Sequence, residues 1–172
     1  MKYKIEQCTK ADLQTIFKRY EEATLLQKEK KIIGVWPKFD RALIEREIEE
    51  GRQWKIVFGP HIVCVWAITY SDPLIWGERD RDPSIYIHRI ATHENFRGQQ
   101  MVQKIVTWAI ARAKIEKKAF IRLDTVGENK ALIAHYKNMG FSFLGMFSLS
   151  NTQGLPAHYD LAPTCLFEIA LN

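Results

Sequence analysis

One strand–helix–strand unit in the middle of the chain constrains the fold more than any other feature. The pattern predicts an apolar strand over residues 84–92, an amphipathic helix from residue 99 to about residue 117, and a second strand over 119–126. A helix that connects two neighbouring strands of one sheet makes them parallel, and the crossover is almost always right-handed. Ligands of such sheets bind at the carboxyl ends of the strands. The residues after Thr92 are therefore expected at a binding edge.

The segments around this unit alternate between strand and helix patterns. Period-two patterns predict strands over 3–8, 54–58, 62–70, 141–149 and 164–171. Helices are predicted after Thr9, over 41–50 and over 130–138, and residues 71–83, with two prolines, are predicted to be a long loop. No repeat or linker divides the chain. The sequence predicts one α/β domain over 1–172, with a mixed central sheet of about six to seven strands and helices on both faces.

The composition excludes several broad classes of protein. Hydrophobic residues make up 47% and charged residues 26%, as in soluble globular domains. No apolar run approaches the ~20 residues of a membrane span, and the first residues lack the apolar core of a signal peptide. The three cysteines, Cys8, Cys64 and Cys165, lack metal-ligand spacing and fit a reducing compartment. A cytoplasmic protein without a membrane or nucleic-acid partner is expected, since a net charge of +5 is mild.

The turn after the first strand of the unit has the features of an anion site. Residues 97–102, with the sequence Arg-Gly-Gln-Gln-Met-Val, place a basic residue and a glycine at the start of the helix. The first N–H groups of a helix have no partner inside it, and the helix dipole favours negative charge there. This stretch is therefore predicted to hold a phosphate.

Three motifs occur in order over residues 84–143. The first is Ile90-Ala91-Thr92-His93-Glu94-Asn95-Phe96-Arg97-Gly98, the second is Asp124-Thr125 with Asn129, and the third is Ala131-Leu132-Ile133-Ala134-His135-Tyr136-Lys137-Asn138-Met139-Gly140-Phe141. Together they resemble the GCN5-related N-acetyltransferases, the GNAT superfamily, and the third motif is the more specific. One departure is plain, because Gln100 and Val102 stand where that family usually has small residues.

The resemblance implies a GNAT-like sheet in which a splayed pair of parallel strands holds acetyl-CoA. It also implies transfer of the acetyl group to a primary amine by direct attack, with the Tyr136 hydroxyl protonating the departing thiolate. The residues implied in cofactor binding are Ile90, Ala91 and Thr92 for the pantetheine arm, Arg97, Gly98, Gln99, Gln100, Met101 and Val102 for the pyrophosphate, and Asn129. The acceptor would be a small-molecule or peptide amine, and a homodimer would be unsurprising.

The attacking amine must first lose a proton, because alkyl amines have pKa values near the ~10.4 of lysine. His88 is the candidate base, since imidazole titrates near neutrality and alternation places His88 on one strand face with Tyr86 and Ile90. Each role has a structural alternative. His88 can be a hydrogen-bonded histidine inside the sheet, Tyr136 a packed aromatic ring, and Asn129 a helix cap.

Acceptor specificity is expected from Trp36, Phe39 and the 71–83 loop, which the resemblance places near the acceptor groove. The loop contains Trp76 and acids that could attract a cationic amine, although a merely solvated loop explains the acids better. These acids are Glu78, Asp80 and Asp82.

Two further expectations complete the prediction. His93 and His135 have no ligand-like spacing to other His, Cys or acidic residues, so no metal site is predicted. The alternative function is a non-catalytic or regulatory acyl-CoA-binding domain with a degenerate pyrophosphate loop, which Gln100 and Val102 suggest because glycine allows a closer backbone approach to phosphate.

Overall fold

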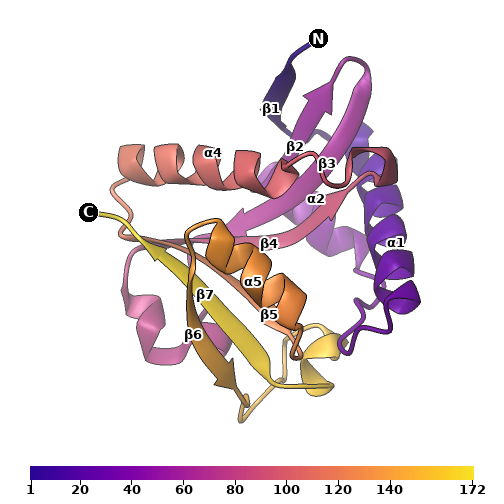
Figure 1. Ribbon diagram of the computed structural model, residues 1–172. Helices are drawn as coiled ribbons and strands as arrows, with labels where there is room; N and C mark the ends of the chain where they lie inside the picture. Colours follow the sequence, from indigo (N-terminus) through magenta and orange to yellow (C-terminus); the bar gives the residue numbers. More distant parts are fainter.

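A mixed sheet of seven strands organises the structure, a computed structural model that describes residues 1–172 (Figure 1). The strand order is β1-β2-β3-β4-β5-β7-β6, and only β4 and β5 run parallel to each other. The strands are β1 (Tyr3–Gln7), β2 (Gln53–Phe58), β3 (His61–Thr69), β4 (Ser84–Thr92), β5 (Phe120–Val126), β6 (Ser142–Phe147) and β7 (Thr164–Ala170). The predicted class is confirmed: a mixed α/β fold with a central sheet that contains one parallel pair.

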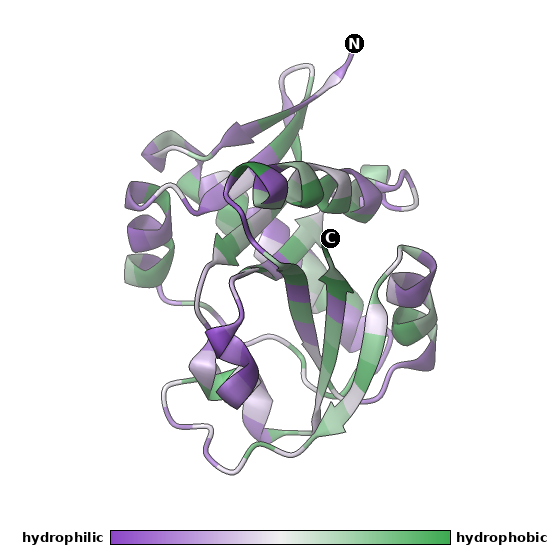
Figure 2. Cartoon of the chain, turned by 90° about the vertical axis from the view of Figure 1, so that its left-hand side faces the viewer, coloured by the Kyte–Doolittle hydropathy of each residue, from purple (hydrophilic) through white to green (hydrophobic).

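Helices cover both faces of this sheet. The four longer ones are α1 (Leu13–Glu29), α2 (Arg41–Glu49), α4 (Met101–Ile115) and α5 (Lys130–Asn138). The main core lies under α4 and α5, where Ile105 and Ala109 are fully buried, and a second core lies under α1 and α2 around Ile16 and Ile44. Figure 2 shows the corresponding pattern, with largely green strands and helices that alternate between purple and green. No helix combines the length and the apolar character that a membrane span requires.

The predicted strand–helix–strand unit is present as β4, α4 and β5. The parallel ladder runs from Ser84↔Phe120 to Ile87↔Leu123 and stops there. Beyond these rungs β4 continues to Thr92 and β5 to Val126 without pairing to each other. The two strands therefore diverge, and His88 and Asp124 are the first residues past the fork.

A bulge in β4 changes which residues share a face. The register with β3 skips between Val65↔Ala91 and Ala67↔His88, and Arg89 has a φ of +50°. An extra residue in one strand of a pair interrupts the alternation of side chains. As a result Ile90 packs against the core that contains Ile87, on the face opposite Tyr86, which belongs to another cluster. The prediction that Tyr86, His88 and Ile90 share one face is wrong for this reason.

The segment 71–83 is not the irregular loop that its prolines suggested. It contains α3 (Pro73–Trp76) and a 3₁₀ turn over Gly77–Arg81. Pro73 occupies the first turn of α3, where its missing N–H is no loss. Trp76 is 3% exposed and packs against Tyr86 and Arg122, so this segment is anchored to the sheet by a buried aromatic ring.

Helix α4 begins two residues later than predicted. Gln100 precedes its first residue, Met101, and has a left-handed conformation with φ +60° and ψ +36°. A residue in that conformation cannot continue a right-handed helix, which explains the boundary. The other predicted helices are present, and α1 runs on to Glu29 after a 3₁₀ turn that opens at Thr9.

Candidate acetyl-CoA and amine site

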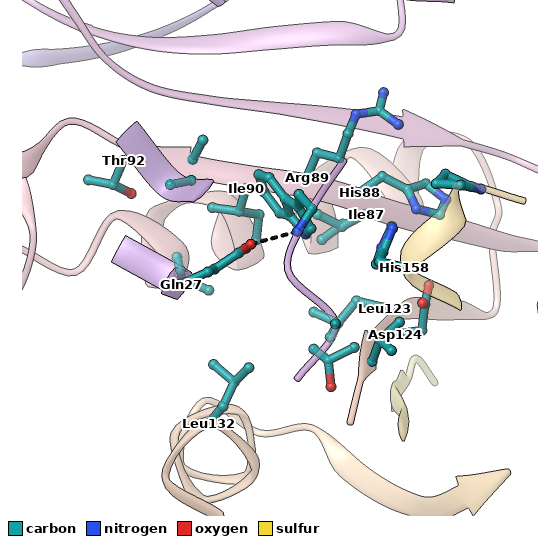
Figure 3. A pocket seen from close by; sticks show the side chains of 18 of the residues that line it. Gln27, Ile87, His88, Arg89, Ile90, Thr92, Leu123, Asp124, Leu132 and His158 are labelled. Carbon is teal, nitrogen blue, oxygen red and sulfur yellow. Dashed lines mark hydrogen bonds between the residues drawn. The ribbon is translucent and has the colours of Figure 1, made fainter. Parts of the chain in front are cut away.

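A cavity of about 770 Å³ opens where β4 and β5 diverge. Residues from β4, β5, α1, α4, α5 and the β6–β7 loop line it, so every layer of the fold contributes. Figure 3 shows His88, His158 and Asp124 gathered at one end, with Thr92, Gln27 and Leu132 toward the other. We call the end near Thr92 and Arg97 the backbone end, and the end near His88 and Asp124 the acid end.

The backbone end offers N–H groups that have no partner within the protein. The N–H groups of Gly98, Gln100, Met101 and Val102 donate to no protein group, and the first N–H of this region with a helical acceptor is that of Lys104, 3.2 Å from the Gln100 carbonyl oxygen. Such a set of free donors at the start of a 15-residue helix can bind an anion. The arrangement fits the pyrophosphate that the sequence predicted here.

Two of the residues predicted for this role use their N–H groups internally. The Arg97 N–H donates to Glu94 O and the Gln99 N–H to Phe96 O, each at 3.3 Å. The Gln99 side chain accepts a hydrogen bond from the Tyr3 hydroxyl at 2.8 Å, and Gln99 does not line the cavity. Arg97 does line it, and its guanidinium donates to the Glu22 carbonyl oxygen at 3.3 Å.

The departures from the small-residue pattern do not close this end. Gln100 and Val102 both line the cavity. Gln100 holds the left-handed conformation that glycine adopts at no steric cost, which costs a glutamine about 1–2 kcal/mol. The peptide groups that would face phosphate are therefore in place, at a cost in conformational strain.

The edge of β4 next to this end is open. Ala91 and Thr92 pair with Val65 and Cys64 of β3, but no strand pairs with their other edge because β5 has diverged. Ile90, Ala91 and Thr92 all line the cavity. An extended ligand can bind such an edge as an added strand does, which fits the predicted contact with a pantetheine arm.

Tyr136 and Asn129 come to the cavity from α5 and its start. Tyr136 is 8% exposed, its ring packs on Phe141 and Phe167, and no protein group shares a hydrogen bond with its hydroxyl. Burial, with the nearby charges of Asp124 and Cys64, raises the pKa of Tyr136 to about 12, so the phenol keeps its proton at neutral pH. Asn129 lines the cavity and also caps α5, since its Oδ1 accepts from the Leu132 N–H at 3.1 Å.

The acid end brings together side chains that lie far apart in the sequence. One polar atom from each of Asp72, His88 and Asp124 lies within 4.8 Å of the others, and His88 Nε2 is 3.5 Å from Asp72 Oδ2. Asp72 precedes α3, while His88 and Asp124 come from the forked strands. The Tyr159 hydroxyl donates a 2.6 Å hydrogen bond to Asp124 Oδ2.

Burial shifts all three groups toward their neutral forms. Burial, with repulsion from Asp124 and Asp80, raises the pKa of Asp72 to about 8. Burial also raises the pKa of Asp124 to about 6, although the hydrogen bond from Tyr159 opposes this. Burial, with the charges of Arg89 and Arg52, lowers the pKa of His88 to about 3. His88 is therefore neutral at physiological pH, and Asp72 titrates closest to it.

The structure separates the acids of segment 71–83 that the sequence grouped together. Glu78 is exposed and pairs with Arg81, Asp82 pairs with Arg122, and Asp80 accepts from the Tyr86 hydroxyl at 2.7 Å. None of these three lines the cavity. The acid of this segment that does line it is Asp72, which sequence reasoning missed.

The remaining wall of the cavity is aromatic. Trp36 and Phe39 line it as expected, and the Trp36 N–H donates to Gln27 Oε1 at 2.8 Å (Figure 3). His158 and Tyr159, from the β6–β7 loop, were also missed. No local pattern in the sequence singles them out, because only the folded sheet brings that loop to the fork.

Comparisons with known proteins agree with this geometry. Residues 11–141 match the Acetyltransferase (GNAT) family. The chain is 36% identical to the uncharacterized N-acetyltransferase YesJ of Bacillus subtilis (strain 168) over 74 residues, which is 43% of this chain and 41% of that relative.

Solved structures show the same fold over nearly the whole chain. A GNAT-family acetyltransferase from Listeria monocytogenes 4b F2365 superposes with a TM-score of 0.76 at 21% identity, covering 98% of this chain and 95% of that one. A putative acetyltransferase, yncA from Salmonella typhimurium, solved with its cofactor acetyl-CoA, gives a TM-score of 0.68 at 15% identity over 99% and 94% of the two chains. With the family match over residues 11–141, these findings establish that the chain belongs to the Acetyltransferase (GNAT) family.

Proposed function

We propose that this protein is an N-acetyltransferase that moves an acetyl group from acetyl-CoA to a primary amine by direct attack. One observation supports this most strongly. The protonated hydroxyl of Tyr136, which has no partner in the protein, shares one cavity with free backbone donors at the start of α4 and with the acids at the fork. A GNAT enzyme of this kind needs a place for the cofactor, a proton for the thiolate and a place for the amine.

The chain's own residues fit the two ends of acetyl-CoA. The free N–H groups of Gly98, Gln100, Met101 and Val102 would bind the pyrophosphate, with Arg97 adding positive charge. The open edge of β4 over residues 90–92 would pair with the pantetheine arm. Asn129 lines the same cavity and keeps its side-chain NH₂ group available for the cofactor.

The reaction then needs two proton movements. The neutral amine attacks the thioester carbonyl carbon, so that a C–N bond forms and the C–S bond breaks. Tyr136 gives its phenolic proton to the sulfur, and the second amine proton, passed through solvent, restores the phenol. His88 lies at the acid end of the cavity, but its pKa, lowered to about 3, makes it a poor proton acceptor, so it would only accept a hydrogen bond from the amine.

The acceptor that this cavity suggests is a small-molecule or peptide amine with an apolar body. Trp36 and Phe39 form an aromatic wall of the cavity, and Phe39 packs against His158 of the acid end. A reducing compartment such as the cytoplasm suits the protein, because Cys8, Cys64 and Cys165 are all free and buried.

Turnover of acetyl-CoA tests the proposal directly. We expect thiol release, followed with a thiol reagent, with at least one member of a panel of alkyl amines, aminoglycosides, polyamines and peptides. If the protein binds CoA tightly but no amine in the panel causes thiol release, it is instead an acyl-CoA-binding domain. The left-handed conformation of Gln100, at a position where the family usually has a small residue, is the observation that favours this second function.

A further inference from the structure

The acid end lies directly past the fork between β4 and β5. His88 and Asp124 are the residues that immediately follow the last paired rung, Ile87↔Leu123. Their strands have begun to diverge, so their side chains border the cavity instead of a neighbouring strand. Asp72 comes from the turn between β3 and α3 and completes the group. The sheet itself therefore brings these three acceptors together.

Two buried polar atoms at this end have no hydrogen-bond partner. Asp72 Oδ2 is one of them. The backbone of Asp72 is held in place, because its N–H donates to Asp80 Oδ1 at 2.7 Å. His158 Nδ1 is the other, on a side chain from the β6–β7 loop that is only 7% exposed and lines the same cavity. Figure 3 places His158 beside His88 and Asp124. Buried polar groups normally have partners, so these atoms indicate a ligand that supplies donors.

An alkylammonium group matches this arrangement. It has three N–H donors and no acceptor, whereas Asp72, Asp124 and neutral His88 each offer an acceptor. Acceptors placed about 2.8 Å from one tetrahedral nitrogen stand about 4.6 Å apart. The three polar atoms all lie within 4.8 Å of one another, and His88 Nε2 and Asp72 Oδ2 are 3.5 Å apart, so the spacing is not larger than one nitrogen can span.

The charges facing the site also favour a cation. The two guanidinium groups nearby are committed, since Arg89 is held by Glu47 and Arg52 pairs with Glu50 and Glu47. When every group is ionised, the carboxylates around the acid end outnumber the guanidiniums. The titratable and charged groups that interact with it or line the same cavity are Glu47, Arg52, Asp80, Arg89, Tyr136, His158 and Tyr159.

We propose that Asp72, His88 and Asp124 bind the ammonium group of the acceptor, and that the Asp72 carboxylate takes the proton that the amine must lose before it attacks. This inference rests on the proposed acetyl transfer and names the residues that would select its acceptor. Asp124 is held in place by Tyr159, and His88 accepts an N–H of the acceptor without becoming charged.

The proton balance assigns each step to a group. In the free protein at neutral pH, Asp72 is mostly protonated because its pKa is raised to about 8. Binding of an ammonium ion displaces that proton to solvent, since the cation favours the carboxylate. The ammonium N–H then transfers its proton to Asp72, which leaves a neutral amine with a lone pair for attack. Of the three groups, Asp72 has the pKa nearest that of an alkyl amine, which makes it the best-matched proton acceptor.

Binding of matched probes tests the inference without requiring turnover. Primary amines and the alcohols of the same shape, such as benzylamine with benzyl alcohol and butylamine with butanol, are titrated calorimetrically into the CoA-bound protein. We expect at least one amine to bind at least tenfold more tightly than its alcohol. Asp72→Asn and Asp124→Asn should each remove most of that preference while leaving CoA binding unchanged. The matched control is Glu78→Gln, on the same segment but exposed and outside the cavity.

Proton release gives a second, independent readout. Titration of the amine at pH 7 in buffers of different ionisation enthalpy should show release of close to one proton in the wild type. Asp72→Asn should release almost none, because an amide does not ionise near neutral pH. The inference is overturned if no amine is preferred over its alcohol, if Asp72→Asn keeps the preference, or if Zn²⁺ binds stoichiometrically to these three residues and is displaced by none of the amines. A protein that prefers amines yet never releases thiol would overturn only the proposed acetyl transfer.

Discussion

The two ends of the cavity are made of different parts of the chain. The backbone end consists of peptide N–H groups at the start of α4 and the open edge of β4, all from residues 90–102. The acid end consists of side chains from three separate places, Asp72, His88 and Asp124, with Tyr159 and His158 from a fourth. A site made of peptide groups depends on backbone shape, whereas a site made of side chains depends on the identity of each residue.

This difference explains how the chain can depart from its family at one end. Gln100 and Val102 change the side chains of the backbone end but leave its N–H groups free. A comparable change at the acid end would remove a charge or a proton acceptor outright. Substitutions should therefore have large effects at the acid end and small ones at the backbone end, and the following predictions test that contrast in order of expected size.

The largest effect is expected from Tyr136→Phe, because Tyr136, like the residues of the acid end, acts through a single side chain. It removes the proton donor for the thiolate and keeps the ring that packs on Phe141 and Phe167. General-acid catalysis is worth about 100-fold or more, so kcat should fall by about that factor. Steady-state kinetics and calorimetric CoA binding on the same samples separate the two effects. An unchanged kcat would show that Tyr136 is a packing residue only.

The next largest effect concerns the pH profile at the acid end. In the wild type, kcat/KM should rise with pH up to about 8, because Asp72 acts as a carboxylate and its raised pKa delays ionisation. Asp72→Asn should lower kcat/KM about tenfold or more and abolish that rise, leaving only the titration of the free amine near its ~10.4. Rate measurements from pH 6 to 9.5 check this. A variant with the wild-type profile would exclude Asp72 from proton transfer.

A smaller effect is expected from Arg97→Ala at the backbone end. The guanidinium is partly exposed and already donates to the Glu22 carbonyl oxygen, while four backbone N–H groups remain free nearby. An exposed charge is worth up to about 1 kcal/mol, so the Kd for CoA should rise by no more than about fivefold. Titrations at low and high salt would detect the charge component. A loss of about 100-fold would mean that this end, too, depends on side chains.

The smallest effect is expected from Gln100→Gly. Relief of the left-handed strain should stabilise the protein by about 0.5–1 kcal/mol, after the greater flexibility of glycine in the unfolded chain is subtracted. Lys117→Gly is the matched control, because Lys117 is exposed, has a φ of +56° and lies outside the cavity. Urea unfolding should show similar gains for both variants, with CoA affinity unchanged for Lys117→Gly and equal to or above wild type for Gln100→Gly. A drop in CoA affinity would show that the glutamine side chain itself binds the cofactor.

The parts that could be predicted from the sequence are the parts held by local interactions. Hydrophobic periodicity was enough for β4, α4, β5 and α5, and the residues of the backbone end follow one another along the chain. Asp72 and His158 could not be found this way, because their role depends on the fork between β4 and β5 and on a loop that returns to it. The sequence pointed instead to Glu78, Asp80 and Asp82, which the folded chain pairs with Arg81, Tyr86 and Arg122 outside the cavity.

The bulge at Arg89 has a consequence for how this site can change. The bulge adds one residue to β4, so residues before it and after it do not follow one continuous alternation of faces. Point substitutions do not change which face each residue lies on, so the lining of the cavity can be altered one side chain at a time. Deleting Arg89 would remove the extra residue and restore regular alternation, with Ile90 still facing α4 and Ala91 still facing α1. A deletion at the bulge should therefore be better tolerated than a deletion in the regular part of β4, where a shift of one residue moves side chains to the opposite face.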